Sequence, residues 1–220
     1  MKKRFSVIIS AYNIEKYIKR AIDSVLNQSF KNFELIVVND CSTDETLKII
    51  KEYNDERLII INNEKNKGLG AVRNIGIEKA RGEYILHLDG DDTLYEEKTL
   101  EKIHCLIGEE QPDIVYLGFK DVGGYNKIHL STAENSTKEA RLTCDINFSV
   151  PSKCWRREFL QENNIKFKED IYYEDMVYST HATILAKDYK YGSFPTFKYY
   201  RNRQRQYNVN SIYEEMLRYV

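Results

Sequence analysis

Three carboxylates, Asp89, Asp91 and Asp92, directly follow the apolar run of residues 84–88. In an extended chain, side chains two residues apart point the same way, so Asp89 and Asp91 can converge on one point, while Gly90 lets a ligand approach the backbone. Mg²⁺ and Mn²⁺ prefer oxygen ligands and keep coordination positions open for substrate phosphates. The segment therefore predicts a metal-bridged diphosphate site, with Asp91 and Asp89 as the candidate metal ligands.

Two other interpretations of this segment remain. Thr93 and Glu96 have the T-x-x-E spacing of a capping box, so the acidic residues are alternatively the start of the next helix. Residues 89–93 also fit the D-x-D-x-T pattern of haloacid-dehalogenase-type phosphatases. Those enzymes carry the motif on the opening strand of their sheet, whereas several strands and helices are predicted before residue 89 here, which disfavours a phosphatase.

The elements that must position these residues alternate between strand and helix up to about residue 119. Short apolar runs predict strands, and apolar residues that recur every three or four positions predict amphipathic helices between them. This alternation indicates an α/β fold with a largely parallel sheet and helices on both faces. The expected strands span residues 5–10, 34–39, 57–61, 83–88 and 113–119, and the expected helices about 14–26, 42–53, 70–80 and 96–107.

Polar residues follow the carboxyl ends of the first four expected strands. Tyr12 and Asn13 follow the first, Asp40 the second, residues 62–67 the third and residues 89–92 the fourth. Open α/β sheets bind ligands in the crevice beyond these strand ends. The order of the elements therefore predicts a nucleotide-type ligand at this edge of the sheet.

Residues 68–73 resemble the glycine fingerprint of dinucleotide-binding proteins, but Arg73 stands where the third glycine belongs. An NAD site is therefore disfavoured. Arg73 is expected to project from the first turn of a helix toward a phosphate or a nucleobase. An ordinary surface arginine is the alternative.

The second half of the chain is less regular, but no linker or repeat separates it from the first half. We therefore expect a single domain over residues 1–220. Residues 212–220 have the pattern of a helix that breaks off, so we expect the native chain to continue beyond Val220. The expected elements are a hairpin turn at Gly123-Gly124, a polar stretch over residues 131–150, helices over about 154–163 and 175–187, and a strand over 189–200.

Glu174 and Asp175 stand just before the second of these helices and follow Tyr172-Tyr173. Acidic residues at the start of a helix are favourable caps, which is one interpretation. The other is a general base, because a helix N-terminus at the edge of a cleft can meet a substrate proton.

Composition limits the partners and the compartment. With 33 Lys and Arg against 34 Asp and Glu, the formal net charge is −1, which argues against wholesale nucleic-acid binding. The basic cluster over residues 201–205 is either a solvated turn or a patch that faces phosphates or anionic lipid. The 4 cysteines form no C-x-x-C pair, and the apolar stretch near the N-terminus is too short for a signal peptide. We expect a reduced protein of the cytoplasm.

Taken together, these segments resemble the inverting family 2 glycosyltransferases of the GT-A fold, of the kind that builds bacterial capsule and lipooligosaccharide. The resemblance runs from residue 5 to about residue 201. It implies a nucleotide-binding half over residues 1–119 and an acceptor-binding half over residues 120–220. The matching segments are Ser6–Asn13, Val38–Asp44, Asn66–Asn74, the D-x-D motif at Asp89–Asp91, Lys153–Arg157 and the E-D pair at Glu174-Asp175.

The resemblance implies a role for each of these segments. Tyr12 would pack on a uracil ring, and Asp40 would accept a hydrogen bond from its N3–H, so Asp40 is expected to recognise the base rather than support the fold. Asp91, with Asp89, would hold a Mn²⁺ or Mg²⁺ ion, and Asp175 would be the catalytic base. The residues implied to contact the nucleotide are Ala11, Tyr12, Asn13, Asp40, Lys67, Arg73 (at the base), Asp89, Gly90, Glu174 and Arg201 (at the diphosphate).

The expected activity is the metal-dependent transfer of a sugar from a UDP-sugar to a hydroxyl of a saccharide or lipid-linked saccharide, with inversion of the anomeric centre. Peripheral association with the inner face of the cytoplasmic membrane fits such an acceptor. A sugar nucleotidyltransferase is one alternative, but it usually carries a glycine-rich basic loop where residues 11–15 stand. A non-catalytic nucleotide-sugar-binding protein is the other, although it would tolerate the loss of Asp91 or Asp175, and both are present.

Overall fold

Four parallel strands form one side of the sheet in the computed structural model, which describes residues 3–131 and 149–201. Their carboxyl ends are level, because Ala11 pairs with Asn39, Asn39 pairs with Asn62, and Ser10 pairs with Asp89. This register brings the polar residues that follow the strands to one edge, as expected from the sequence. In spatial order the strands are β3 (Leu58–Asn62), β2 (Phe33–Asn39), β1 (Phe5–Ala11) and β4 (Tyr84–Asp89).

The other side of the sheet is mixed. The strand expected at about 113–119 is present but does not neighbour β4, because a short strand runs antiparallel between the two. That short strand, Lys153–Arg156, contradicts the helix expected from residue 154, which begins only at Arg157. The strands on this side are β8 (Lys153–Arg156), β6 (Ile114–Val122), β9 (Tyr189–Tyr200), β5 (Thr93–Leu94) and β7 (Ile128–His129), which pairs with β6.

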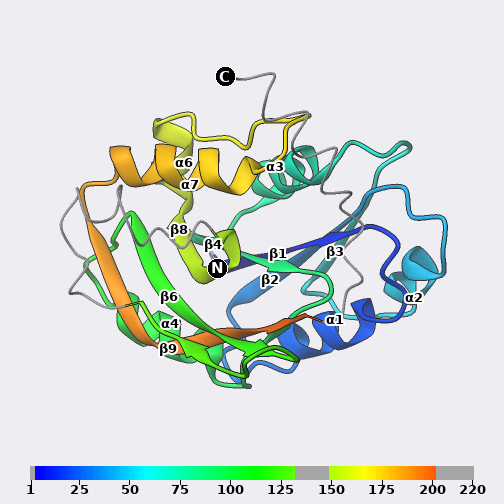
Figure 1. The fold of residues 1–220 in the computed structure, drawn as a ribbon, viewed down its shortest axis with the longest axis horizontal. Coiled ribbons are helices and arrows are strands. Elements are labelled where there is room, and N and C mark those ends of the chain that lie inside the picture. The colour runs from blue at the N-terminus through cyan, green and yellow to red at the C-terminus, as the bar shows by residue number, and fades with distance from the viewer. Residues whose placement is uncertain (1–2, 132–148, 202–220) are drawn as a thin grey trace.

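Helices cover both faces of the sheet, and each face has its own core (Figure 1). Strand β1 supplies both cores, since Val7 and Ile9 pack on one face and Ile8 on the other. The first face carries α1 (Ile18–Leu26), α2 (Thr46–Lys51) and α4 (Thr99–Ile107). The second carries α3 (Leu69–Lys79), α6 (Arg157–Glu162) and α7 (Glu174–Leu185). A 3₁₀ turn at Val150–Ser152 leads into β8.

Helix α3 packs unusually close to its neighbours, which fixes the residues it carries. A Cβ atom at Gly76 would lie 2.4 Å from Cγ2 of Ile8 in β1, and one at Gly70 would lie 2.4 Å from the carbonyl oxygen of Lys168. Neither position has room for a larger residue. Arg73, which lies between these two glycines, is therefore held at a fixed depth between the sheet and the segment before α7.

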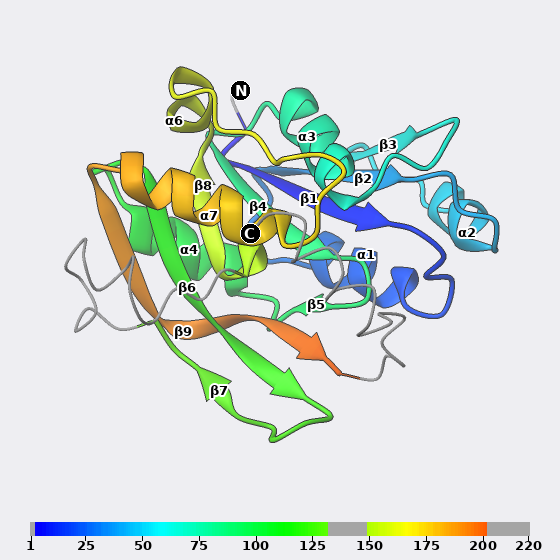
Figure 2. The same cartoon turned by 45° about the horizontal axis from the view of Figure 1, so that its top comes forward.

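The structure after Asp92 contradicts the capping-box interpretation of Thr93 and Glu96. Thr93 lies in β5 rather than at a helix start, and α4 begins six residues later at Thr99. The hydroxyl of Thr99 accepts the hydrogen bond from the backbone N–H of Glu96. The acidic segment is thus not the first turn of a helix. The hairpin expected at Gly123-Gly124 is confirmed, since it joins β6 to β7 and projects at the lower edge in Figure 2.

The helix expected over residues 212–220 and most of the polar stretch after residue 131 lie outside the described residues. Within residues 3–131 and 149–201, none of the helices has the length and apolar composition needed to cross a lipid bilayer.

Candidate active site

The turn after β1 is tied to the loop after β2. Asn13 has a left-handed backbone (φ 50°), its N–H donates to the hydroxyl of Ser42, and its side-chain oxygen accepts from the N–H of Thr43. Ala11 is buried at the end of β1, whereas the ring of Tyr12 is 50% exposed. The turn therefore holds Tyr12 at the rim of the strand ends with its ring accessible, as a stacking residue requires.

Asp40 holds the loop that follows β3. Its buried carboxylate accepts hydrogen bonds from the side chain of Asn63 (2.8 Å) and from the backbone N–H groups of Lys67 and Gly68 (3.0 Å each). The expectation that Asp40 does not support the fold is therefore wrong, while its contact with uracil stays a prediction. Next to it, Asn62, Asn63, Glu64, Lys65 and Lys67 line a polar surface pocket of about 490 Å³.

The Asp89–Asp92 segment is tightly packed. A Cβ atom at Gly90 would lie 2.3 Å from Cδ1 of Ile14 and 2.7 Å from the carbonyl oxygen of Ser10, so only glycine fits there. Asp92 is buried, and its Oδ1 accepts from the N–H of Tyr200 at 3.0 Å. Asp92 thereby anchors the end of β9 to the end of β4, which leaves Asp89 and Asp91 as the candidate ligands.

Among residues 3–131 and 149–201, no group of three or more His, Cys, Asp or Glu side chains is arranged to hold a metal ion. Asp91 is 6% exposed, and its carbonyl oxygen accepts a hydrogen bond from the guanidinium of Arg20. One or two carboxylates are nevertheless a normal protein share for Mg²⁺, because waters and substrate phosphates complete its shell. The donor set therefore fits a cation shared with a diphosphate.

Arg73 is the centre of the site. It is 1% exposed, which rules out the surface arginine considered from the sequence. Its Nη1 donates to Oε1 of Glu174 at 3.0 Å and makes a close contact with Oδ1 of Asp175, and its Nη2 donates to Oδ1 of Asp89 at 3.2 Å. One guanidinium thus joins the end of β4 to the first turn of α7. The structure thereby brings three of the sequence-predicted site residues, Asp89, Glu174 and Asp175, around a fourth.

The charges of this cluster do not balance, since three carboxylates share one guanidinium. Burial opposes the charge of Arg73, yet the three carboxylates hold its pKa above the ordinary value. Burial also raises the pKa of Glu174 to about 7, where the charge of Asp175 adds to it and Arg73 opposes it. Although Glu174 lies within ion-pair distance of Arg73, we expect it to keep a proton near neutral pH, because one cation cannot neutralise three anions in a poorly solvated site.

The protonation of Glu174 predicts a pH-dependent stability. Folded Glu174 holds its proton up to about pH 7, whereas the unfolded chain releases it near pH 4.5. The folded state therefore binds more protons between these values, and its stability declines as the pH rises through this window. Glu174→Gln stays neutral and is expected to flatten the fall in melting temperature between about pH 5 and about pH 8. Thermal denaturation measures this slope, and Glu101→Gln, in the first turn of α4, is the matched control. An unchanged slope in Glu174→Gln would contradict the assignment.

Lys153 is a site residue to which the sequence gave no role of its own. It is 1% exposed on β8, and its Nζ donates to the carbonyl oxygen of Ser149 at 3.0 Å. Burial lowers the pKa of Lys153 to about 7, and the charge of Asp175 partly offsets this effect. The sequence signal for Lys153 was its place directly before Cys154 and Trp155, two residues that are buried in the structure. Because lysine is rarely fully buried without a partner, a lysine in such a segment indicates a specific role.

Two further side chains, Arg201 and His87, are not part of this cluster. Nε of Arg201 donates to the buried carboxylate of Asp121 in β6 at 2.9 Å. The contact of Arg201 with a diphosphate stays a prediction. His87 is buried in the core, at 3% exposure. Burial and the charge of Arg73 hold the pKa of His87 well below its ordinary value.

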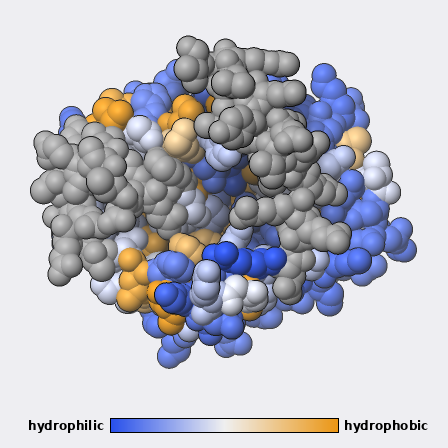
Figure 3. Space-filling model, viewed as in Figure 1, coloured by the Kyte–Doolittle hydropathy of each residue, from blue (hydrophilic) through white to orange (hydrophobic). Residues whose placement is uncertain are grey.

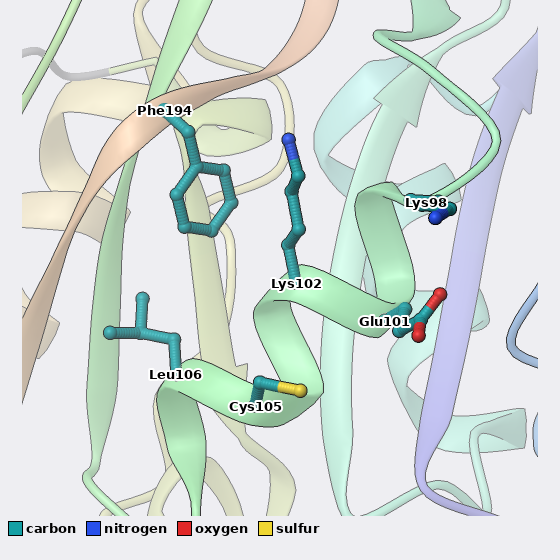
Figure 4. A pocket seen from close by; sticks show the side chains of 6 residues that line it. All are labelled: Lys98, Glu101, Lys102, Cys105, Leu106 and Phe194. Carbon is teal, nitrogen blue, oxygen red and sulfur yellow. The ribbon is translucent and has the colours of Figure 1, made fainter.

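The surroundings of the cluster differ on the two faces of the sheet. Apolar side chains are exposed on α7, at Met176 and Val177 directly after Asp175 and at Ile184 near the end of the helix, and Figure 3 shows apolar patches in this part of the surface. A second pocket lies on the α4 face, which is the opposite face of the sheet (Figure 4). Its lining residues are Lys98, Glu101, Lys102, Cys105, Leu106 and Phe194, and they include none of the cluster.

Comparison with known proteins identifies the family to which this fold belongs. Residues 6–163 match the family model described as Glycosyl transferase family 2. The chain belongs to this family, which confirms the resemblance seen in the sequence.

Two curated relatives and one crystal structure support the assignment. The chain is 32% identical over 216 residues to the poly(ribitol-phosphate) beta-N-acetylglucosaminyltransferase TarS of Staphylococcus aureus, covering 96% of this chain and 37% of TarS. It is 40% identical over 105 residues to the UDP-Glc:alpha-D-GlcNAc-diphosphoundecaprenol beta-1,3-glucosyltransferase WfaP of Escherichia coli, covering 48% of this chain and 42% of WfaP. The chain therefore spans less than half the length of these relatives.

The crystal structure of residues 1–349 of S. aureus TarS with UDP-GlcNAc superposes with a TM-score of 0.81 at 29% identity, covering 97% of this chain and 64% of that one. The GT-A fold expected from the sequence, with helices on both faces of a mixed sheet, is thereby confirmed. The sheet is less parallel than expected, because β8, β5 and β7 all pair antiparallel.

Proposed function

We propose that this chain transfers a sugar from a UDP-sugar to a hydroxyl of a saccharide or lipid-linked saccharide, with inversion, in the synthesis of a bacterial surface polymer. The observation that carries the proposal is the convergence of Asp89, at the end of β4, and Asp175, at the start of α7, on Arg73. The names of the relatives support the donor and the stereochemistry, because TarS was crystallised with UDP-GlcNAc and both relatives are named for beta-linked products.

The donor would lie across the strand ends. The turn Ala11-Tyr12-Asn13 offers an exposed ring for the uracil, and Asp40 orders the loop that carries Lys67. Asp91, with Asp89 beside it, would hold Mn²⁺ or Mg²⁺, which when bound neutralises the diphosphate and the charge that grows on it. In this scheme residues 1–119 bind the nucleotide and residues 120–220 bind the acceptor.

Asp175 would act as the general base. Its carboxylate takes the proton of the acceptor hydroxyl while that oxygen attacks the anomeric carbon of the donor. The bond from this carbon to the diphosphate oxygen breaks in the same displacement, and its electron pair leaves with UDP. Because attack and departure occur on opposite sides of the carbon, one displacement inverts the centre. Asp89 and Asp175 converge on one arginine, so the leaving group and the base would be held close together.

The acceptor would approach over α7. Exposed Tyr172 and Tyr173 precede the base, and exposed apolar residues follow it on the same helix. Such a surface suits the rings of a saccharide or the apolar part of a lipid-linked one. For that reason we also propose that the protein works at the inner face of the cytoplasmic membrane.

Calorimetry and a turnover assay test the proposal. UDP is titrated into the purified protein with and without Mn²⁺, and release of UDP is then measured from UDP-GlcNAc, UDP-Glc, UDP-Gal and UDP-GalNAc. We expect UDP to bind more tightly than CDP or GDP, and one donor to be turned over fastest. Equal binding of the three nucleotides, or release of pyrophosphate from UTP and a sugar 1-phosphate, would contradict the proposal, the second outcome in favour of a nucleotidyltransferase.

A further inference from the structure

One buried guanidinium connects the two halves of the site. We propose that Arg73 is a positioning residue for Asp175: it fixes the carboxylate of the base relative to Asp89 at the diphosphate end and does not bind the nucleotide. This inference rests on the proposed function. It departs from the role that the family resemblance implies for Arg73, which is to support the nucleobase.

The geometry of the ion pairs is the first argument. Nη1 of Arg73 faces Glu174 and Asp175, and Nη2 faces Asp89. The planar guanidinium keeps these two nitrogens at a constant separation and direction, so the two carboxylate groups on either side keep a constant separation as well. A lysine, with one ammonium nitrogen on a flexible stem, has no such fork.

The rigidity of the arginine is the second argument. The guanidinium lies over the ring of Phe167 at 5.2 Å, and that ring stacks on Tyr178 with centroids 3.8 Å apart. Tyr178 is three residues after Asp175 in α7, so both side chains lie on the same side of the helix. Phe167 therefore braces Arg73 against the helix that carries the base. Gly70 and Gly76, on either side of Arg73 in α3, allow this helix to pack closely against the Lys168 backbone and against Ile8 of β1.

Burial is the third argument. The side chain of Arg73 is 2% exposed, and both of its terminal nitrogens are already engaged by carboxylates. A nucleobase at the exposed rim beside Tyr12 would have to displace these ion pairs to reach it. Loss of Arg73 should therefore affect turnover much more than it affects nucleotide binding.

Two substitutions at Arg73 test this inference, with Arg57→Met as the matched control. Arg57 also pairs with a carboxylate, Asp55, and lies over a ring, Phe33, but it precedes β3 outside the site. We expect Arg73→Met to lower kcat about 10²-fold, because an error of about 1 Å in the position of a catalytic group has that effect. Arg73→Lys should recover only part of this loss. KM for the UDP-sugar and the Kd of UDP should change little, and Arg57→Met should lower the melting temperature without lowering kcat.

A second measurement does not depend on activity. The unfolding of Arg73→Met, Asp175→Asn and the double variant forms a double-mutant cycle, and we expect non-additive effects because the two side chains are in contact. Additive effects would overturn the contact. A wild-type kcat in Arg73→Lys, or a Kd for UDP that weakens as much as kcat falls, would overturn the positioning role. A wild-type protein that transfers no sugar would instead overturn the proposed function, and the cycle would still report on the pair.

Discussion

Asp175→Asn is expected to lower sugar transfer about 10²- to 10⁴-fold while UDP still binds, because a general base typically contributes that factor. Asparagine has nearly the same shape, but its amide cannot take the proton of the acceptor hydroxyl. Donor binding should survive, since the residues proposed to hold the nucleotide follow β1, β2, β3 and β4, whereas Asp175 lies in the first turn of α7. Turnover with the preferred UDP-sugar and titration calorimetry with UDP measure the two effects separately.

Glu174→Gln is the matched comparison for this experiment. Glu174 occupies the same turn and contacts the same arginine, but its side chain is 14% exposed against 29% for Asp175, so an acceptor hydroxyl reaches it less easily. We expect Glu174→Gln to lower the turnover rate less than Asp175→Asn does. NMR of the product formed from a UDP-α-sugar should give a β-anomeric configuration. An α-linked product, or near wild-type turnover of Asp175→Asn, would mean that the base lies elsewhere or that the mechanism is retaining.

The first half of the fold is predictable because its signals are local. Each strand is a short apolar run, and in α1 the buried residues Ile18, Ala21, Ile22 and Val25 follow the helical period, so each element can be recognised without its neighbours. The observed strands β1 to β4 and helices α1 to α4 lie within a few residues of the expected ones. The level strand ends then follow from the parallel connections, and with them the place of Tyr12, Asp40 and Asp89.

Strand β8 is not predictable in this way because its cause is not local. Its sequence Lys-Cys-Trp-Arg is too short to show a period, and it runs into the helix that starts at Arg157. What makes it a strand is the pairing of Trp155 with Ile85 on one side and with Ile114 on the other. Contacts between residues so far apart in the chain decide the structure of such short segments.

The candidate site shows the same division. Sequence patterns identify Asp89, Arg73 and Asp175 as residues of interest, but the partners of Arg73 at Glu174 and Asp175 are about a hundred positions away along the chain. No pattern around Arg73 distinguishes an arginine that faces a ligand from one that is buried among carboxylates. The second role of Asp40 was missed for the same reason, because the loop it binds begins 23 residues later.

Asp91→Asn is expected to remove the dependence of UDP binding on Mn²⁺. Asp91 is held in place from two directions: Arg20 donates to its carbonyl oxygen and also stacks on Tyr200 at 3.9 Å, and the N–H of Tyr200 donates to the adjacent Asp92. The substitution should therefore change the ligand chemistry without moving the backbone. Replacing a carboxylate by a neutral amide weakens the hold on a hard divalent cation, so UDP should lose at least about tenfold in affinity in the presence of Mn²⁺, or ~1.4 kcal/mol.

Asp113→Asn is the control for this second experiment. Asp113 is also a buried aspartate, but it pairs with Arg156 and accepts from the N–H of Lys187 before β6, away from the strand ends that carry the proposed site. Its substitution should lower the melting temperature, because Arg156 loses the nearer of its two carboxylate partners, and should preserve the increase in UDP affinity that Mn²⁺ gives. Titration calorimetry of UDP into both variants, with Mn²⁺ and with EDTA, separates the two effects. If Asp91→Asn kept the full increase with Mn²⁺, Asp91 would not be a metal ligand, and the cation would have to be held at Asp89 or by the diphosphate alone.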